Sequence, residues 1–369
     1  MAGRGIRHEI RASNPLVRQP RRIPCQIPHR VDIPGFCPIQ ADRRAPCPNG
    51  QAHKVSIYLI KCYHARVKKI TLSDKEPILM HFLNRNNPCW CGSGVKYKKC
   101  HYDFDQKLAR CRLQGCIIPA RNMIKTPSQI EAIRESAKVN IAVLDYVAEH
   151  IRAGVTTEEI DQWVCRQTAR HHAVPAPLHY EGFPKSVCTS INEVVCHGIP
   201  SPDVVLKDGD IVNVDCSTNL NGYYSDSSRM FCIGDVSPEK KKLVEVTKEC
   251  MELGLKEVKP WAFMGDMSQA VNDHARAHGY RVVRDIGGHG VGLEFHEEPW
   301  VSYVAPRGTE MILAPGMMFT IEPMINMGTE EVYVDEDDNW TVYTEDGKPS
   351  AQWEIQVLVT EDGCEVISY

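Results

Sequence analysis

The sequence predicts an α+β fold with a mostly antiparallel sheet, and two observations indicate it. Amphipathic helical patterns occur in two blocks after residue 126, and each block is followed by several short runs rich in β-branched and aromatic residues. Helices and strands that are segregated in this way favour an antiparallel sheet over alternating βαβ units. The 369 residues are 43% hydrophobic, which is enough for one large core or two moderate ones.

The first helical block carries two capping signals. Thr126 is followed by Pro127 and Gln129, the pattern of a capping box with proline in the first helical turn, and apolar residues then recur at helical spacing. Thr156 and Glu159 repeat the capping box before a second amphipathic segment. We therefore predict two consecutive helices here.

Strands and a second pair of helices follow in order. Strands are predicted at residues 186–191, 210–218 and 222–234, and helices after Ser237 and around residues 267–279. The rest of the chain, from about residue 281, is predicted to form strands and loops, because it consists of apolar runs such as MMFTIEPMIN and SAQWEIQVLVTED.

The first 79 residues differ from the rest in composition. Residues 1–75 contain 15 Lys and Arg against 4 Asp and Glu, whereas the remainder contains 28 against 43. Prolines recur without a period, so we predict a basic, proline-rich, poorly structured extension over residues 1–79. Two alternatives stay open: the basic segment binds nucleic acid, or the functional chain begins at Met80.

Cysteine content and hydropathy indicate the cellular compartment of the protein. The chain has sixteen cysteines but no apolar core of a signal peptide and no run of eighteen apolar residues. We therefore expect a cytoplasmic protein without a membrane contact, whose cysteines are reduced thiols or metal ligands.

One short segment, CWCGSGVKYKKCH, concentrates metal-binding side chains. Cys89, Cys91, Cys100 and His101 supply four sulfur and nitrogen donors at the short spacing typical of structural zinc. Four protein ligands leave no coordination position for water, so we predict a structural site and not a catalytic one. The alternative is a set of unpaired structural thiols.

Five other residues form a second candidate metal site. Asp215 and Asp226 lie on two predicted strands joined by a turn at residues 219–222, so their carboxylates are predicted to face one another across the hairpin. His289 lies among glycines that would let a ligand approach closely, and Glu322 and Glu354 lie in apolar strands. Each residue alone has a structural explanation, but four buried carboxylates together would need neutralising cations.

Six motifs carry a family resemblance: KSVCTSINEVVCHGIP, DGDIVNVD, YYSDSSRMF, GGHGVGLEFHEEP, FTIEPMIN and SAQWE. Together they resemble type I methionine aminopeptidase, a metallopeptidase with the pita-bread fold, from about Ile124 to the C-terminus. The resemblance implies removal of the N-terminal methionine from nascent proteins, preferentially when the second residue is small. It also implies a dinuclear metal site that activates a hydroxide for attack.

The resemblance assigns roles to individual residues. It implies that Asp226 and Glu354 bridge two divalent ions (Co, Mn, Fe or Zn), that Asp215 binds one of them, and that His289 and Glu322 bind the other. His197 is implied near the scissile amide nitrogen, His296 at the carbonyl oxygen, and Glu322 as the proton shuttle. Besides these two histidines, the implied lining of the methionine pocket is Tyr180, Phe183, Cys188, Phe295 and Trp340.

The cysteine segment resembles the SEC-C motif, a small zinc-binding module. We therefore predict a SEC-C-like module at residues 80–104, a linker at 105–123 and a pita-bread catalytic domain at 124–369. Nearby lysines and aromatic residues make ribosome docking a hypothesis for the module. We expect a monomer. Two alternative functions stay open: a proline-directed peptidase of the same superfamily and a metal-free adaptor at the ribosome.

Overall fold

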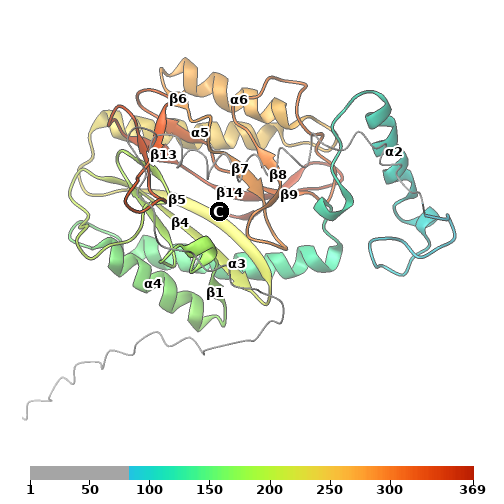
Figure 1. Cartoon of the computed structure of the whole chain (residues 1–369), viewed down its shortest axis with the longest axis horizontal. Coiled ribbons are helices and arrows are strands. Elements are labelled where there is room, and N and C mark those ends of the chain that lie inside the picture. The colour runs from blue at the N-terminus through green and yellow to red at the C-terminus, as the bar shows by residue number, and fades with distance from the viewer. Residues whose placement is uncertain (1–82) are drawn as a thin grey trace, which may run out of the picture. The chain divides into compact units, whose positions relative to one another are not determined.

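The computed structural model of the protein describes residues 83–369 (Figure 1). The predicted extension over residues 1–79 and the alternative start at Met80 lie outside the described residues. The longer helices are α2 (Tyr102–Leu113), α3 (Pro127–His150), α4 (Thr157–Arg170), α5 (Pro238–Glu257) and α6 (Met264–Ala277). Short 3-10 turns occur at η2 (Tyr97–Lys99), η3 (Arg121–Met123) and η4 (Tyr180–Gly182).

Fifteen strands are described in residues 83–369, and all their pairings are antiparallel. The strands before α5 are β1 (Val174–Pro175), β2 (Cys188–Ile191), β3 (Val194–Cys196), β4 (Ile211–Leu220) and β5 (Tyr223–Cys232). Those after α6 are β6 (Arg281–Val282), β7 (Gly288–Gly290), β8 (Glu297–Val301), β9 (Met318–Ile321), β10 (Met324–Asn326), β11 (Val332–Val334), β12 (Val342–Thr344), β13 (Ser350–Gln352), β14 (Ile355–Val359) and β15 (Cys364–Ser368).

Two sheets position the candidate site. One has the order β1-β4-β2, with β5 on β4, and the other has the order β15-β14-β9-β7-β8. An isolated bridge between Ser228 of β5 and Glu354, directly before β14, joins them. Two three-stranded sheets, β13-β10-β6 and β11-β12-β3, complete the arrangement. The predicted α+β fold with antiparallel sheets is confirmed.

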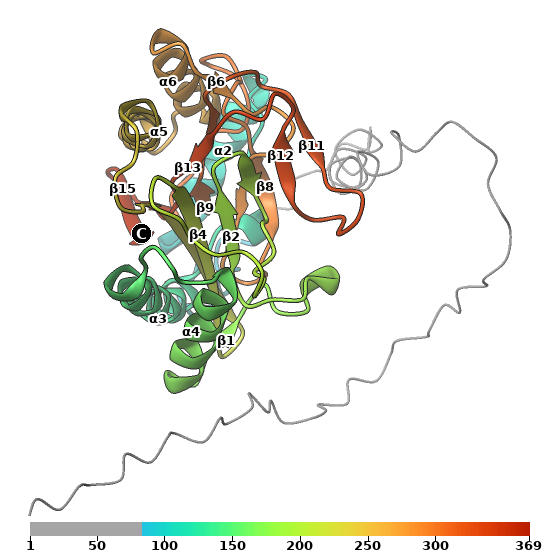
Figure 2. The same cartoon turned by 90° about the vertical axis from the view of Figure 1, so that its left-hand side faces the viewer.

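The sheets lie between two pairs of helices (Figures 1 and 2). On one side, Val143 and Leu144 of α3 pack with Val212 and Val214 of β4 in one buried apolar cluster. On the other, residues of α5 and α6 pack with Phe319 of β9 and other strand residues in a larger cluster. Burial of these apolar faces supplies most of the driving force for docking the helices on the sheets.

The predicted starts of three helices are confirmed by their caps. Thr126 and Thr156 each accept a hydrogen bond from a backbone N–H three residues on, and Gln129 and Glu159 complete both capping boxes. The Ser237 side chain caps α5 in the same way, without a capping box. These side chains satisfy backbone N–H groups that have no partner within the first helical turn.

The N-terminal segment 83–101 packs on the rest of the described fold through α2. This helix spans residues 102–113, so it overlaps the first part of the linker predicted at 105–123. Its Leu108 is buried in the larger apolar cluster. Phe104 contacts the ring of Trp261, with 5.5 Å between centroids. Asp105, which is fully buried, accepts hydrogen bonds from Trp90, Tyr97 and Arg121. The module is therefore attached by a packed helix as well as by the chain.

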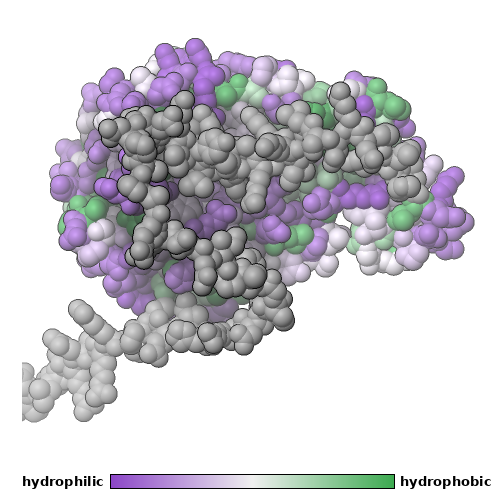
Figure 3. Space-filling view, viewed as in Figure 1, coloured by the Kyte–Doolittle hydropathy of each residue, from purple (hydrophilic) through white to green (hydrophobic). Residues whose placement is uncertain are grey.

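Among residues 83–369, no helix is long and apolar enough to cross a membrane. On the face shown in Figure 3, hydrophilic residues dominate the described surface and hydrophobic ones are scattered.

Candidate metal centre

The β4–β5 hairpin brings the two aspartates together. Its two-residue loop, Asn221–Gly222, has positive φ at both positions (55° and 86°), as a tight hairpin turn requires. The register pairs Asp215 with Ser228 and Ser217 with Asp226. The two carboxylates thus lie on one face of the hairpin as diagonal neighbours.

The two glutamates come from adjacent strands of the other sheet. Ile321 of β9 pairs with Ile355 of β14, which places Glu322 beside Glu354 at the strand ends. Each backbone N–H of Glu354 and Ser228 donates to the other residue's carbonyl oxygen at 3.3 Å, so Glu354 lies against the aspartate hairpin. The Asp215 carboxylate interacts electrostatically with those of Glu354 and Asp226. Four carboxylates from two sheets therefore converge.

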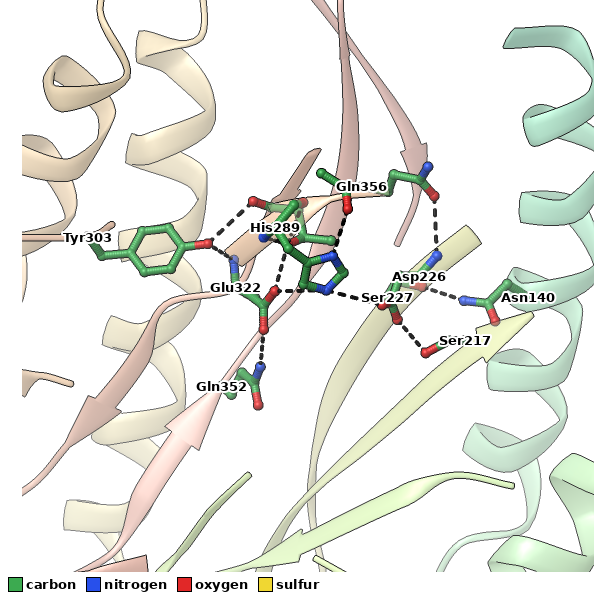
Figure 4. Close-up of polar contacts among 11 residues, drawn as sticks. Asn140, Ser217, Asp226, Ser227, His289, Tyr303, Glu322, Gln352 and Gln356 are labelled. Atoms are coloured by element: carbon green, nitrogen blue, oxygen red, sulfur yellow. Dashed lines mark hydrogen bonds and ion pairs between the residues drawn. The ribbon is translucent and has the colours of Figure 1, made fainter. Parts of the chain in front are cut away.

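His289 of β7 lies between Glu322 and Asp226 (Figure 4). Its Nδ1 donates to the backbone carbonyl of Gly290 at 2.9 Å, so the Nε2 of the neutral ring carries the lone pair. That Nε2 lies 3.6 Å from Asp226 Oδ2 and 3.6 Å from Glu322 Oε1. A lone pair that faces two carboxylates is stable when a cation or a shared proton lies between them.

The glycines next to His289 have a different role from the predicted one. A Cβ on Gly288 would lie 2.7 Å from the Thr320 carbonyl oxygen, and one on Gly290 would lie 2.2 Å from the Glu298 carbonyl oxygen. These glycines therefore allow neighbouring backbone to approach β7, and we correct the prediction that they make room for a ligand.

The electrostatics of the centre are unfavourable without a cation. Burial raises the pKa of Asp215 to about 7 and that of Glu322 to about 8. Burial and neighbouring carboxylates raise the pKa values of Asp226 and Glu354 well above their usual range. Asp215 Oδ1 and Glu354 Oε2 are buried and have no hydrogen-bond partner. Hard oxygen donors and one imidazole that lack protein partners fit divalent metal ions.

Two further predicted histidines lie beside the centre. The His296 ring is 4.2 Å from that of His289, centroid to centroid. Burial lowers the pKa of His197 to about 4 and that of His296 well below its usual range, so both rings are neutral at neutral pH. His197 also has a φ of 56°, a left-handed backbone conformation that is uncommon for residues other than glycine.

The predicted pocket residues are brought together in two aromatic groups. Tyr180 contacts Phe295 and His296, at centroid distances of 4.9 Å and 5.0 Å. Trp340 contacts Phe183 at 5.2 Å and His197 at 6.2 Å. Cys188 of β2, which is buried, pairs with Asp215 of β4. Both aromatic groups thus include one of the two histidines.

Sequence reasoning missed the side chains that orient the carboxylates. Thr320 and Gln352 donate to the two oxygens of Glu322, at 2.6 Å and 3.0 Å. Ser217 donates to Asp226 at 2.7 Å, and Tyr303 accepts from the Glu322 backbone N–H. The sequence held a partial signal, because Thr320 and Gln352 each stand two positions before a predicted ligand and so share its face of the strand.

The four predicted zinc ligands also come together. His101 Nδ1 lies 3.2 Å from Cys89 Sγ and 3.1 Å from Cys100 Sγ, and the Sγ atoms of Cys91 and Cys100 are 3.6 Å apart. Tetrahedral zinc with ~2.3 Å bonds to sulfur spaces its ligands about 3.5–3.8 Å apart. The observed spacing is within a few tenths of an ångström of that tetrahedron.

Comparisons with known proteins agree with these two centres. The model of metallopeptidase family M24 matches residues 131–361, and that of the SEC-C motif matches residues 85–103. The chain belongs to metallopeptidase family M24. Membership of this family implies divalent metal cofactors, and the chain is a metal-dependent aminopeptidase.

Methionine aminopeptidases are among the curated relatives and the solved structures that this chain resembles. The chain is 43% identical to that of Chlamydia trachomatis over 289 residues, which cover 78% of this chain and 99% of the relative. It is 48% identical to methionine aminopeptidase A of Synechocystis over 240 residues, 65% of this chain and 94% of the relative. The crystal structure of the Rickettsia prowazekii enzyme matches 67% of this chain and 99% of its own, with a TM-score of 0.65 and 43% identity. The pita-bread fold is therefore confirmed.

The raised carboxyl pKa values predict how the metal-free M24 enzyme responds to pH. The pKa values of Asp215 and Glu322 are about 7 and 8 in the folded protein, against ordinary values of 3.8 and 4.5, so the folded state holds protons that the unfolded chain has released. Stability from these groups is lost as pH rises. The pKa values of His197 and His289 are about 4 in the folded protein, against an ordinary value of 6.5. These two histidines therefore make stability rise with pH, but only below pH 6.5. Between pH ~6.5 and ~8 the carboxyls dominate, at about 1.4 kcal/mol per pH unit for each proton.

Chelator-treated protein should therefore lose stability to urea over that pH window. Asp226→Asn, treated identically, should show a shallower loss because one charge of the cluster is gone. Addition of Mn²⁺ should flatten the wild-type profile. Equal slopes for both metal-free proteins would contradict this electrostatic description.

Proposed function

We propose that this enzyme removes the N-terminal methionine from nascent polypeptides, preferentially when the second residue is small. The observation that carries the proposal is the convergence of four buried carboxylates and the His289 Nε2 lone pair beside two neutral histidines and two aromatic groups. Its similarity to methionine aminopeptidases along almost their whole length supports this substrate.

Five residues would hold the metal ions. Asp226 and Glu354 would be shared between the two ions, because the charges of both Asp215 and Glu322 act on each of these carboxylates. Asp215 would complete one ion's ligands, and His289 with Glu322 the other's. When bound, two divalent ions polarise the scissile carbonyl and lower the pKa of water. Co, Mn, Fe and Zn all suit this mixed oxygen and nitrogen donor set.

The chain's own residues would orient the substrate and move protons. His296, neutral and beside His289, can donate a hydrogen bond to the oxygen on which negative charge develops. His197 would hold the scissile amide nitrogen. Glu322, which both Thr320 and Gln352 orient, would take a proton from the attacking water and deliver it to the leaving amine.

The aromatic groups would bind the methionine side chain. Tyr180, Phe183, Phe295 and Trp340 offer ring faces and edges, and Cys188 offers a small thiol. A flexible thioether gains dispersion and sulfur–aromatic contacts in such a setting.

The N-terminal module would bind one structural zinc ion through Cys89, Cys91, Cys100 and His101. Docking at the ribosome fits the basic residues Lys96, Lys98 and Lys99 around it. A monomeric enzyme in the cytoplasm, where nascent N-termini emerge, completes the proposal.

A peptide assay tests the substrate and separates the alternatives. With Mn²⁺ present, the enzyme should release methionine from Met-Ala-Ser and nothing from Ala-Pro-Ala. Release from Ala-Pro-Ala alone would instead assign a proline-directed peptidase. Release from neither peptide by metal-loaded protein would favour the adaptor alternative.

His197→Ala tests the role at the amide nitrogen. Turnover of Met-Ala-Ser should fall by about tenfold or more, the range for loss of a group that acts on the reacting atoms, with metal content unchanged. Asp226→Asn is the contrasting variant, because it should lose bound metal as well as activity. Elemental analysis of both proteins supplies the comparison, and an unaltered His197→Ala rate would reject the assignment.

Cys100→Ser tests the module. The variant should contain one zinc ion fewer per chain, retain its rate on Met-Ala-Ser, and sediment less with ribosomes than the wild type does. Val95→Ser, at an exposed neighbour that is neither a zinc ligand nor one of the basic residues, is a control that keeps the zinc. Unchanged zinc content in Cys100→Ser would contradict the structural site, and unchanged sedimentation would contradict the docking role.

A further inference from the structure

A third group of metal-binding side chains lies on α5 and α6, which contribute no ligand to either centre described above. It consists of Glu249, His274 and His278, each of which offers one ligand atom within 4.8 Å of the others. Nothing in the aminopeptidase chemistry uses these residues.

The packing of the two helices holds the group together. Cys250 of α5 donates from Sγ to the Val271 carbonyl oxygen of α6 at 3.7 Å, and Cys250, Val271 and Ala275 are completely buried. Figures 1 and 2 both show α5 beside α6. Glu249 and His274 directly precede two of these buried residues, so the helix contact fixes them at the edge of the pair.

The two histidines have the spacing of a helical metal site. His274 and His278 are four residues apart, so their rings lie over one another on one face, with 4.5 Å between centroids. His278 Nδ1 hydrogen-bonds the His274 carbonyl oxygen at 3.0 Å, which leaves the Nε2 of a neutral His278 ring with its lone pair. A hydrogen bond of the same kind, from Nδ1 to a backbone carbonyl oxygen, orients His289 in the catalytic centre.

The carboxylate comes from the other helix. Glu249 Oε2 lies 2.8 Å from His274 Nε2. A simple ion pair would account for that contact, but it would give no role to His278. A metal ion would replace the proton between His274 and Glu249 and would bind His278 as the third ligand.

We propose that Glu249, His274 and His278 form a further metal site that binds a borderline divalent cation of the Zn²⁺ type. Two imidazoles and one carboxylate favour such an ion over Mg²⁺ or Ca²⁺, which prefer oxygen ligands alone. His278 is exposed, so water fills the remaining coordination positions. The bound ion links α5 to α6 across their contact.

The test compares zinc binding by two histidine variants of the full-length protein. Wild type, His278→Gln and His171→Gln are dialysed to equilibrium against the same free Zn²⁺ concentration, and bound zinc per chain is measured. His171 is the matched control, because it is also exposed and follows the last turn of a helix. His278→Gln should bind one ion fewer, or bind it about tenfold or more weakly, as when ligand support is removed at other metal sites.

A second measurement identifies the place of binding. Anomalous diffraction at the zinc edge should give a peak among Glu249, His274 and His278 in wild-type crystals and none there in His278→Gln. Release of methionine from Met-Ala-Ser should be equal in all three proteins, which shows that the variants are folded. Equal zinc content in wild type and His278→Gln, or no peak at α5 and α6 in the wild type, would overturn the proposal and leave a histidine–glutamate ion pair.

Discussion

The architecture of the catalytic domain depends on one electrostatic constraint, the burial of four carboxylates and one imidazole between two sheets. Asp215 and Asp226 come from a hairpin, Glu322 and Glu354 from adjacent strand ends, and His289 from a third strand. The cost of burying these charges would oppose folding unless divalent cations offset it. The surrounding hydrogen bonds from Ser217, Thr320 and Gln352 orient the oxygens without neutralising them.

The fold buries these groups by packing a pair of helices on each side of the sheets. The α3–α4 pair buries the hairpin from one side, and the α5–α6 pair buries β9 and its neighbours from the other. Rigid strands thereby hold ligands that are far apart in sequence. The N-terminal module, in contrast, builds its cluster from a thirteen-residue segment and joins the domain through α2 and Asp105. The four predicted zinc ligands are therefore close together in sequence, whereas the ligands of the catalytic centre are far apart.

Local signals predicted much of the fold from the sequence. The capping residues Thr126, Thr156 and Ser237 and the Asn221–Gly222 turn each act within a few residues. The five ligand residues could be proposed from their types and motif context. Their convergence could not, because it depends on a register shared between sheets. The backbone contacts at Gly288 and Gly290 and the packing of the helix at residues 102–113 likewise depend on tertiary structure, whereas the diagonal placement of Asp215 and Asp226 follows from the two-residue turn of their hairpin.

The central claim is that two divalent ions neutralise the buried carboxylates. Anomalous diffraction at the manganese edge, on crystals of protein loaded with Mn²⁺, tests it most directly. We predict two peaks about 3.5–4 Å apart, the separation usual in two-metal sites, with Asp226 and Glu354 contacting both. A centre with no peak, or with the ions bound away from these two carboxylates, would contradict the account.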